Sequence, residues 1–397
     1  MSRDVRRLRH AGQYFVSLWH QAHWSTAIVL YAAIFVIVWA AMWGASHALA
    51  VAPDTNRQPY VGVTPETNSF LAVWQRWDAV QYQAIAEHGY AAFPDALFVP
   101  PLYPGLMRLL RPLTGGNALL AGLIIANVFG ALAAIAFQQI VLTIFRTPAL
   151  AQRALLYFLS FPTAFFLFAP YTESLFLAGA LWYFYFARKQ RFVMAAWWGG
   201  FAAMSRLTGA WLVIPALYLA WNAWREKDPN LRVWLPPAGI IAGASVFPLY
   251  VWARHHLPPW TPLTVQSARF HGGFTLPGVS LWQTFRQIFS GIYPLPNTID
   301  LIFTLLFIIG AIMVARSRLP KALVIYTAAY MLLYLARVAD VYPLLSMPRY
   351  VLILFPVFIV LAQWSQASPW RHRLVLYTSW IGLLYFAGQY AIWGWVA

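Results

Sequence analysis

Residues 117–145 read NALLAGLIIANVFGALAAIAFQQIVLTIF and contain no lysine, arginine, aspartate or glutamate. A helix needs about 20 predominantly apolar residues to cross a bilayer, and this stretch exceeds that length. The remaining apolar segments lie at about 27–50, 154–169, 173–187, 192–205, 208–224, 236–253, 299–315, 322–337, 349–364 and 374–395. The sequence therefore predicts an all-α polytopic membrane protein with about 11 transmembrane helices, forming one integral membrane domain over residues 1–397.

The composition agrees with this class. Of the 397 residues, 61% are hydrophobic and only 10% are charged, whereas a soluble domain carries roughly a quarter charged residues. The apolar run at 27–50 is too long for the core of a signal peptide, so we expect no cleavable leader. The chain has no cysteine, which excludes disulfides and thiol nucleophiles.

The net charge of +16 follows a membrane pattern rather than a nucleic-acid one, so we expect no nucleic-acid partner. Of the 27 basic residues, 17 lie in the N-terminal head and in short connectors near residues 146–153, 188–191, 225–232, 316–321 and 371–373. The excess of positive charge predicts that these connectors and the N-terminus are cytoplasmic. The long connectors 51–116 and 254–298 then lie outside, where we expect the active site.

Connector 51–116 is predicted to form two amphipathic interfacial helices, with inert covers for the bundle as the alternative. Thr64 and Pro65 indicate a helix start, and that helix would end near His88, before Gly89. A second helix begins near residues 100–104. Amphipathic helices of this kind lie in the plane of the membrane surface.

Asp78 interrupts an apolar stripe of the first predicted helix, which also carries Trp74 and Tyr82. A carboxylate facing a partly dry surface costs free energy unless it has a partner or a task. The structural alternatives are a helix cap or an ion pair with Arg76. The outer connector lacks paired acids, so a divalent metal is disfavoured and no cofactor is expected, although Asp78 and Glu173 could still meet in space.

Several arginines at membrane edges are candidates for binding an anionic group. Arg206 and Arg349 adjoin apolar segments, where an arginine is expensive unless it pairs or binds an anion, or snorkels to the interface. The basic loop 254–298, with Arg269 and His271 foremost, suits a lipid phosphate because guanidinium grips phosphate bidentately. A solvated positive loop is the alternative reading.

Five short motifs together resemble one family. They are Trp77-Asp78 with Gly89-Tyr90, Pro101-Leu102-Tyr103-Pro104, Pro170-Tyr171-Thr172-Glu173, Ser205-Arg206-Leu207-Thr208-Gly209 and Pro348-Arg349-Tyr350. Their order over residues 70–350 is similar to that of the PIG-V-type mannosyltransferases, and we expect a prokaryotic member. Leu207 departs from the proline common in the family.

The resemblance implies the C-type glycosyltransferase fold and transfer of a sugar, most simply mannose, from a polyprenyl-phosphate carrier to a lipid or glycan acceptor at the outer or luminal face. Asp78 would be the general base of an inverting displacement, and Arg206, Arg349 or the 254–298 loop would stabilise the phosphate. Trp77, Tyr82 and Tyr103 would stack on sugars, and Glu173 would orient the acceptor or hold Arg206. The alternatives are a lipid or sugar transporter or flippase, and a scaffold without activity of its own.

Overall fold

The computed structural model describes residues 24–52, 60–226 and 230–396. The basic N-terminal head, Asp54 and Lys227, which entered the charge pattern, lie outside the described residues. The regular secondary structure of the described chain is helical apart from one two-stranded sheet, and the predicted all-α polytopic membrane class is confirmed.

Four helices of the described chain are long and apolar enough to cross a membrane. They are α2 (Trp24–Ala48), α6 (Ala118–Phe145), α11 (Leu235–His255) with the turn preceding it, and α14 (Pro294–Ala315). A fifth span is possible if Met347–Ile353 and α17 (Pro356–Ser365), which meet at 82°, count as one broken span. The number eleven stays a prediction.

Other helices, all but α18 shorter than these four, follow the other predicted segments. These are α7 (Pro148–Leu159), α8 (Glu173–Arg188), α9 (Phe192–Ser205), α10 (Val213–Arg225), α15 (Lys321–Leu335) and α18 (Pro369–Ala391). Short 3₁₀ turns lie at Tyr90–Ala92, Pro94–Ala96, Arg111–Thr114, Ala164–Leu167, Leu207–Leu212, Leu231–Trp234 and Val351–Ile353. Breaks therefore flank Pro170 and Arg206, as the short paired segments predicted.

Small residues bring α9 and α11 into close contact. Gly239 and Gly243 lie four residues apart on one face of α11, a spacing typical of tightly packed membrane helices. A Cβ on Gly243 would lie 2.2 Å from the carbonyl oxygen of Gly200, and one on Gly239 would lie 2.5 Å from that of Ala196. The two backbones are thus in direct contact.

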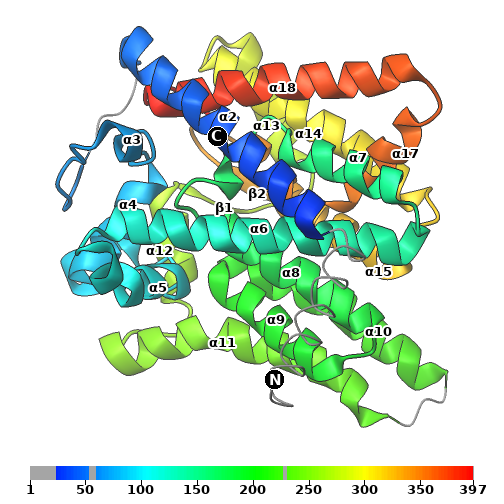
Figure 1. Cartoon of the computed structure of the whole chain (residues 1–397). Coiled ribbons are helices and arrows are strands. Elements are labelled where there is room, and N and C mark those ends of the chain that lie inside the picture. Colours follow the sequence, from blue (N-terminus) through cyan, green and yellow to red (C-terminus); the bar gives the residue numbers. More distant parts are fainter. Residues whose placement is uncertain (1–23, 53–59, 227–229, 397) are drawn as a thin grey trace, which may run out of the picture.

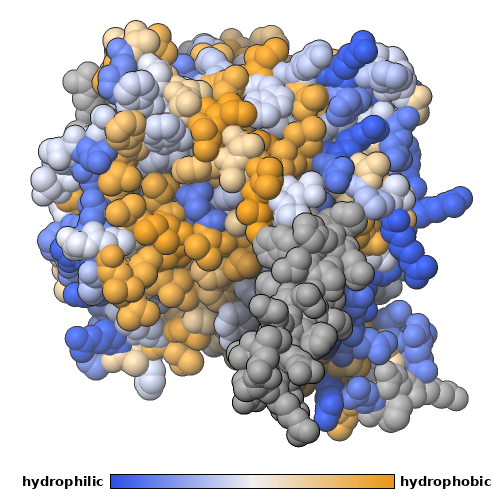
Figure 2. Space-filling model, in the orientation of Figure 1, coloured by the Kyte–Doolittle hydropathy of each residue, from blue (hydrophilic) through white to orange (hydrophobic). Residues whose placement is uncertain are grey.

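The connectors separate into two groups along the helix bundle (Figure 1). Those joining α6 to α7, α10 to α11 and α17 to α18 lie toward the right of the view, and the segments of connector 51–116 lie toward the left. Figure 2 shows apolar surface across the middle of the same face and hydrophilic surface toward its edges. This is the pattern of a protein that crosses an apolar layer.

The predicted start of the first outer helix is wrong. Helix α3 (Ser69–Ala72) begins after Asn68, whose side chain accepts the Phe70 N–H, and the chain then breaks before α4 (Asp78–His88). Thr64 is therefore not the cap, because an asparagine nearer the helix satisfies its free N–H groups. The end at Gly89 is confirmed, with a φ of 80° that glycine adopts readily.

The two helices of connector 51–116 differ in burial. In α4 nearly every side chain between Ala79 and Ala86 is buried, so this helix is part of the core rather than an amphipathic cover. Helix α5 (Leu102–Leu110) begins where predicted, and it buries Tyr103 and Met107 while Leu109 stays exposed. Only α5 has the one-sided burial expected of an amphipathic helix.

The connector 254–298 is folded and joined to a distant segment. It contains α12 (Thr261–Arg269), β1 (Gly272–Phe274) and α13 (Val279–Phe289). Strand β1 pairs antiparallel with β2 (Arg337–Ala339), matching Phe274 with Arg337. A short helix, α16 (Met347–Tyr350), follows β2 and leads into the last two long segments.

Candidate active site

Asp78 is the first residue of α4, and a distorted backbone precedes it. Trp77 has φ 52° and ψ −125°, a conformation that costs a bulky residue of order 1–3 kcal/mol and is typical of functional sites. The Asp78 N–H donates to the Tyr171 hydroxyl at 3.2 Å. The side chain of Asp78 remains 42% exposed.

Neither structural alternative for Asp78 is realised. No side-chain cap bond forms at the start of α4. Arg76 instead donates from Nε to the carbonyl oxygen of Ala391 at 2.8 Å and from Nη1 to that of Ala72 at 2.6 Å. Arg76 thus fastens the α3–α4 break to the end of α18, and the carboxylate of Asp78 is left to pair elsewhere.

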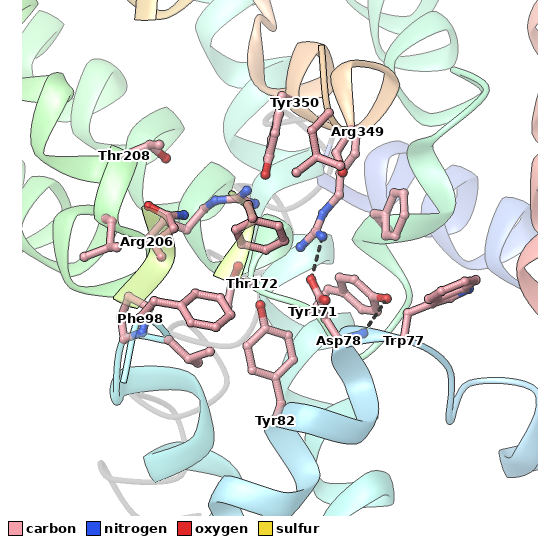
Figure 3. A pocket seen from close by; sticks show the side chains of 18 of the residues that line it. Trp77, Asp78, Tyr82, Phe98, Tyr171, Thr172, Arg206, Thr208, Arg349 and Tyr350 are labelled. Carbon is pink, nitrogen blue, oxygen red and sulfur yellow. Dashed lines mark hydrogen bonds and ion pairs between the residues drawn. The ribbon is translucent and has the colours of Figure 1, made fainter. Parts of the chain in front are cut away.

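That partner is Arg349, which joins two carboxylates. Its Nη1 lies 2.6 Å from Oδ2 of Asp78, and its Nε donates to Oε1 of Glu173 at 2.5 Å. Arg206 donates to the same Glu173 oxygen. Figure 3 shows Arg349 reaching across the cavity to Asp78. The side chain of Glu173 is 0% exposed, so its charge persists only because two guanidinium groups compensate it.

Contacts of its neighbours in α16 and of its own guanidinium position Arg349. The Met347 N–H donates to Oδ1 of buried Asp300 at 3.1 Å, and the Thr163 hydroxyl donates to the Pro348 carbonyl at 2.7 Å. The guanidinium carbon lies 4.6 Å from the centroid of the Tyr171 ring, within reach of a cation–π interaction. The short helix α16 therefore presents Arg349 in one defined position.

These residues line a cavity of about 240 Å³. Of the predicted site residues, Trp77, Asp78, Tyr82, Arg206 and Arg349 line it, and Glu173 lies directly behind the two arginines. The lining residues that sequence reasoning missed include Phe98, Tyr171, Arg337, Tyr350 and Tyr390. Tyr171 and Tyr350 belonged to motifs already singled out, whereas Tyr390 carries no motif and reaches the cavity from α18.

Tyr82 and Tyr103 have different positions. The hydroxyl of Tyr82 points into the cavity from α4 (Figure 3), and burial raises the pKa of Tyr82, so the hydroxyl stays protonated and can donate. Tyr103 is fully buried, does not line the cavity, and donates to the Gly122 carbonyl at 2.9 Å. Tyr103 is therefore not positioned to stack on a sugar in this cavity. Its ring packs edge-on against the ring of Tyr82, with 5.2 Å between the two ring centroids.

The basic loop 254–298 contributes residues to the cavity lining, but not the residues that were predicted. Arg269 and His271 are exposed and do not line it, whereas Gln266 and Phe270 do. The loop's partner strand supplies Arg337, whose guanidinium carbon lies 5.0 Å from the centroid of the Tyr350 ring. Arg337 lies at the end of an apolar segment, and this position in the sequence could have marked it as a candidate site residue.

The cavity lining carries three arginines and one carboxylate, Asp78. With Glu173 behind it, the group still has one positive charge in excess. Asp78 and Glu173 are linked through Arg349, which pairs with both. Within the described ranges, no group of three or more histidines, aspartates and glutamates could hold a metal. Metal independence stays a prediction.

Comparison with known proteins bears on what this cavity does. Residues 23–215 match the family described as Mannosyltransferase (PIG-V). The resemblance predicted from the motifs is confirmed over that range, which includes Asp78, Glu173 and Arg206. Arg337 and Arg349 lie beyond the matched range, so their place beside these residues comes from the fold.

Two curated relatives are similar to parts of the chain. A protein of Rattus norvegicus named GPI alpha-1,6-mannosyltransferase 2 is 34% identical over 138 residues, which are 33% of this chain and 28% of that protein. The protein of the same name from Mus musculus is 37% identical over 109 residues, 25% of this chain and 22% of its own length. The chain thus matches about a quarter of the length of these relatives.

Proposed function

We propose that this protein is a membrane mannosyltransferase that moves a mannosyl residue from a polyprenyl-phosphate carrier to an acceptor hydroxyl. The observation that carries the proposal is the half-exposed carboxylate of Asp78, held at the cavity by Arg349, which is itself held by buried Glu173. The match to the PIG-V family supports the reaction class and the sugar. Prokaryotic origin stays a prediction.

The chemical step is a single displacement. The acceptor oxygen attacks the anomeric carbon, the bond from that carbon to the phosphate oxygen breaks with its electron pair, and Asp78 takes the acceptor proton. Configuration inverts, so a β-linked donor gives an α-linked product, and the carrier leaves as its phosphate.

Arg349 contributes by holding the Asp78 carboxylate in one position at the cavity, with its Nη1 2.6 Å from Oδ2 of Asp78. When Asp78 accepts the proton, Arg349 keeps Glu173 as a counter-ion, so the guanidinium is not left uncompensated. Arg206 shares that anchor and faces the cavity, where it can stabilise charge developing on the leaving phosphate.

The lining of the cavity suits a sugar. Trp77, Tyr82 and Tyr171 provide aromatic surface beside charged groups, and aromatic rings with a polar tip serve both needs at a membrane surface. The acceptor is a lipid or glycan hydroxyl. The active site faces the extracytoplasmic or luminal side, in accordance with the basic residues of the connectors at the other end of the bundle.

The test is Asp78→Asn, which keeps the shape of the side chain and removes its basicity. Transfer of radiolabelled mannose from a polyprenyl-phosphate donor should fall by about 10²-fold or more, since general bases contribute that much. Asp95→Asn is the matched control, because Asp95 is an exposed carboxylate of the same connector that does not line the cavity. A normal transfer rate in folded Asp78→Asn protein would return Asp78 to a structural role.

A transporter or flippase without transfer chemistry predicts a different result. Purified protein in liposomes would exchange labelled lipid-linked sugar across the bilayer while forming no glycosylated product. Sugar transfer that depends on Asp78, without such exchange, would exclude this class.

A further inference from the structure

A second cavity, of about 320 Å³, adjoins the first. The two share Gln266, Phe270, Arg337, Leu345 and Tyr350. The rest of the second cavity is mostly apolar, and its lining includes Leu263, Phe274, Val338, Pro343, Leu344 and Met347. Its volume lies at the lower end of the range of small-ligand pockets, about 300–1,000 Å³.

Arg337 stands at the junction of the two cavities. In the part of the chain that the structure describes, Arg337 has no carboxylate partner, whereas Arg206 pairs with Glu173 and Arg349 pairs with both Asp78 and Glu173. Its guanidinium lies over the Tyr350 ring instead. Arg337 is half-buried, and neither Asp78 nor Glu173 neutralises its positive charge. Its guanidinium group can therefore bind an anionic ligand.

The second cavity also reaches an apolar surface. Leu263 and Phe274 line it, and yet these residues are 52% and 68% exposed. Trp260 and Leu276, close to them in the sequence, are exposed as well. If a long apolar chain enters the second cavity here, the part that stays outside contacts these exposed apolar side chains. Such exposed side chains are best solvated by lipid.

We propose that Arg337 binds the phosphate of the polyprenyl-phosphate donor and that the second cavity takes the first isoprene units of its chain. This placement rests on the proposed function. It puts the sugar in the first cavity, with its anomeric carbon between the phosphate at Arg337 and the base, Asp78. It also differs from the expectation that Arg349 holds the phosphate, because the Nε and Nη1 groups of Arg349 already bond to carboxylates.

Strand pairing sets this geometry. Because β2 matches Arg337 with Phe274 of β1, the arginine and the apolar side chain lie opposite each other on the two-stranded sheet. Gly272 allows the strands to approach, since a Cβ there would lie 2.2 Å from the Val338 carbonyl oxygen. The anionic head and the apolar chain of one ligand would thus be recognised by neighbouring positions of one small sheet.

The test measures binding of farnesyl phosphate to the full-length protein in detergent, with farnesol and inorganic phosphate as comparison ligands. Arg337→Gln should weaken farnesyl phosphate by about tenfold or more and leave farnesol unchanged, since a hydrogen bond to a charged group contributes about 1.5–3 kcal/mol. Arg286→Gln is the control, because Arg286 is an exposed arginine of connector 254–298 that lies outside both cavities.

A second variant tests the apolar part. Gly273 lines only the second cavity, and a Cβ there would meet a single atom, the Ser267 oxygen at 4.0 Å. Gly273→Leu should therefore fill the cavity without a backbone clash and weaken farnesyl phosphate and farnesol alike. The affinity of the Gly273→Leu variant for inorganic phosphate should equal that of wild type. Thermal unfolding checks that both variants are folded.

The outcomes separate the two proposals. One outcome is that wild type binds farnesyl phosphate and transfers sugar, and that Arg337→Gln and Gly273→Leu bind farnesyl phosphate as tightly as wild type. This outcome would overturn the placement of the donor at Arg337 and in the second cavity, while the proposed function would stand. If inorganic phosphate binds as tightly as farnesyl phosphate, the second cavity has no role in donor binding. Failure of wild type to bind farnesyl phosphate would overturn both the placement and the class of donor.

Discussion

At the scale of single residues, the site depends on two carboxylates in contrasting surroundings. Asp78 is half exposed and has one arginine partner, whereas Glu173 is fully buried and has two. Burial makes the charge of Glu173 expensive unless both arginines remain in place. Solvent screens the pair formed by Asp78, so this pair contributes less to stability. Asp78 is thus free for chemistry, and Glu173 positions the arginines.

Glu173→Gln should therefore be more destabilising than Asp78→Asn. Removing one partner from a buried ion pair costs roughly 3–5 kcal/mol, because the remaining charges lose their compensation. We expect a clear fall in the thermal midpoint for Glu173→Gln and a small one for Asp78→Asn, measured on detergent-purified protein. Glu87→Gln, at a partly buried acid in α4, is the control. Equal losses for Asp78→Asn and Glu173→Gln would contradict this division of roles.

At the scale of elements, close helix contacts depend on small side chains. The α9–α11 contact leaves no room for a methyl group at Gly243, which faces the backbone of Gly200. Helix α9 ends at Ser205 and is followed by Arg206, and both residues line the cavity, so this helix connects packing in the bundle to the site. Helix association in lipid relies on such packing because apolar burial from water is absent there.

Gly243→Ala should force α11 away from α9. Overpacking of this kind costs about 1–3 kcal/mol, and we expect a lower thermal midpoint together with weaker sugar transfer. The matched control is Gly44→Ala in α2, where a Cβ would have no atom within 4 Å. That substitution should be neutral or stabilising, by about 0.5–1 kcal/mol. A Gly243→Ala protein as stable as the Gly44→Ala protein would show that the contact is not tight.

At the scale of the whole molecule, the basic connectors and the candidate site lie toward opposite ends of the helix bundle. The basic short connectors lie toward one end and connector 51–116 toward the other (Figure 1). Because positive charge is retained on the cytoplasmic side during insertion, the proposed orientation places the basic connectors inside and the cavity at the outer surface.

Cysteine labelling tests this orientation. The chain has no native cysteine, so Lys189→Cys, Arg318→Cys and His271→Cys each introduce a single reactive site at an exposed position. A membrane-impermeant thiol reagent should label His271→Cys in sealed cells and label the other two only after permeabilisation. Labelling of Lys189→Cys in sealed cells would contradict the proposed topology.

The membrane class, most helix positions and five cavity-lining residues could be predicted from the sequence. Apolar length and charge are local properties, and short motifs keep residues of one turn together, so Asp78, Arg206 and Arg349 could be singled out without a fold. The break before α4, the burial of Tyr103 and the exposure of Arg269 could not be foreseen in the same way.

The pairing of charges, by contrast, depends on how distant segments pack in the folded protein. Arg349 lies 271 positions from Asp78 and 176 from Glu173 in the chain, and Arg337 reaches the cavity because β2 pairs with β1. An arginine beside an apolar segment has the same local pattern whether it binds a carboxylate, a phosphate or water. Packing of distant helices brings two arginines to Glu173, whereas Arg337 has no carboxylate partner among the described residues, because contacts between distant segments depend on the whole fold.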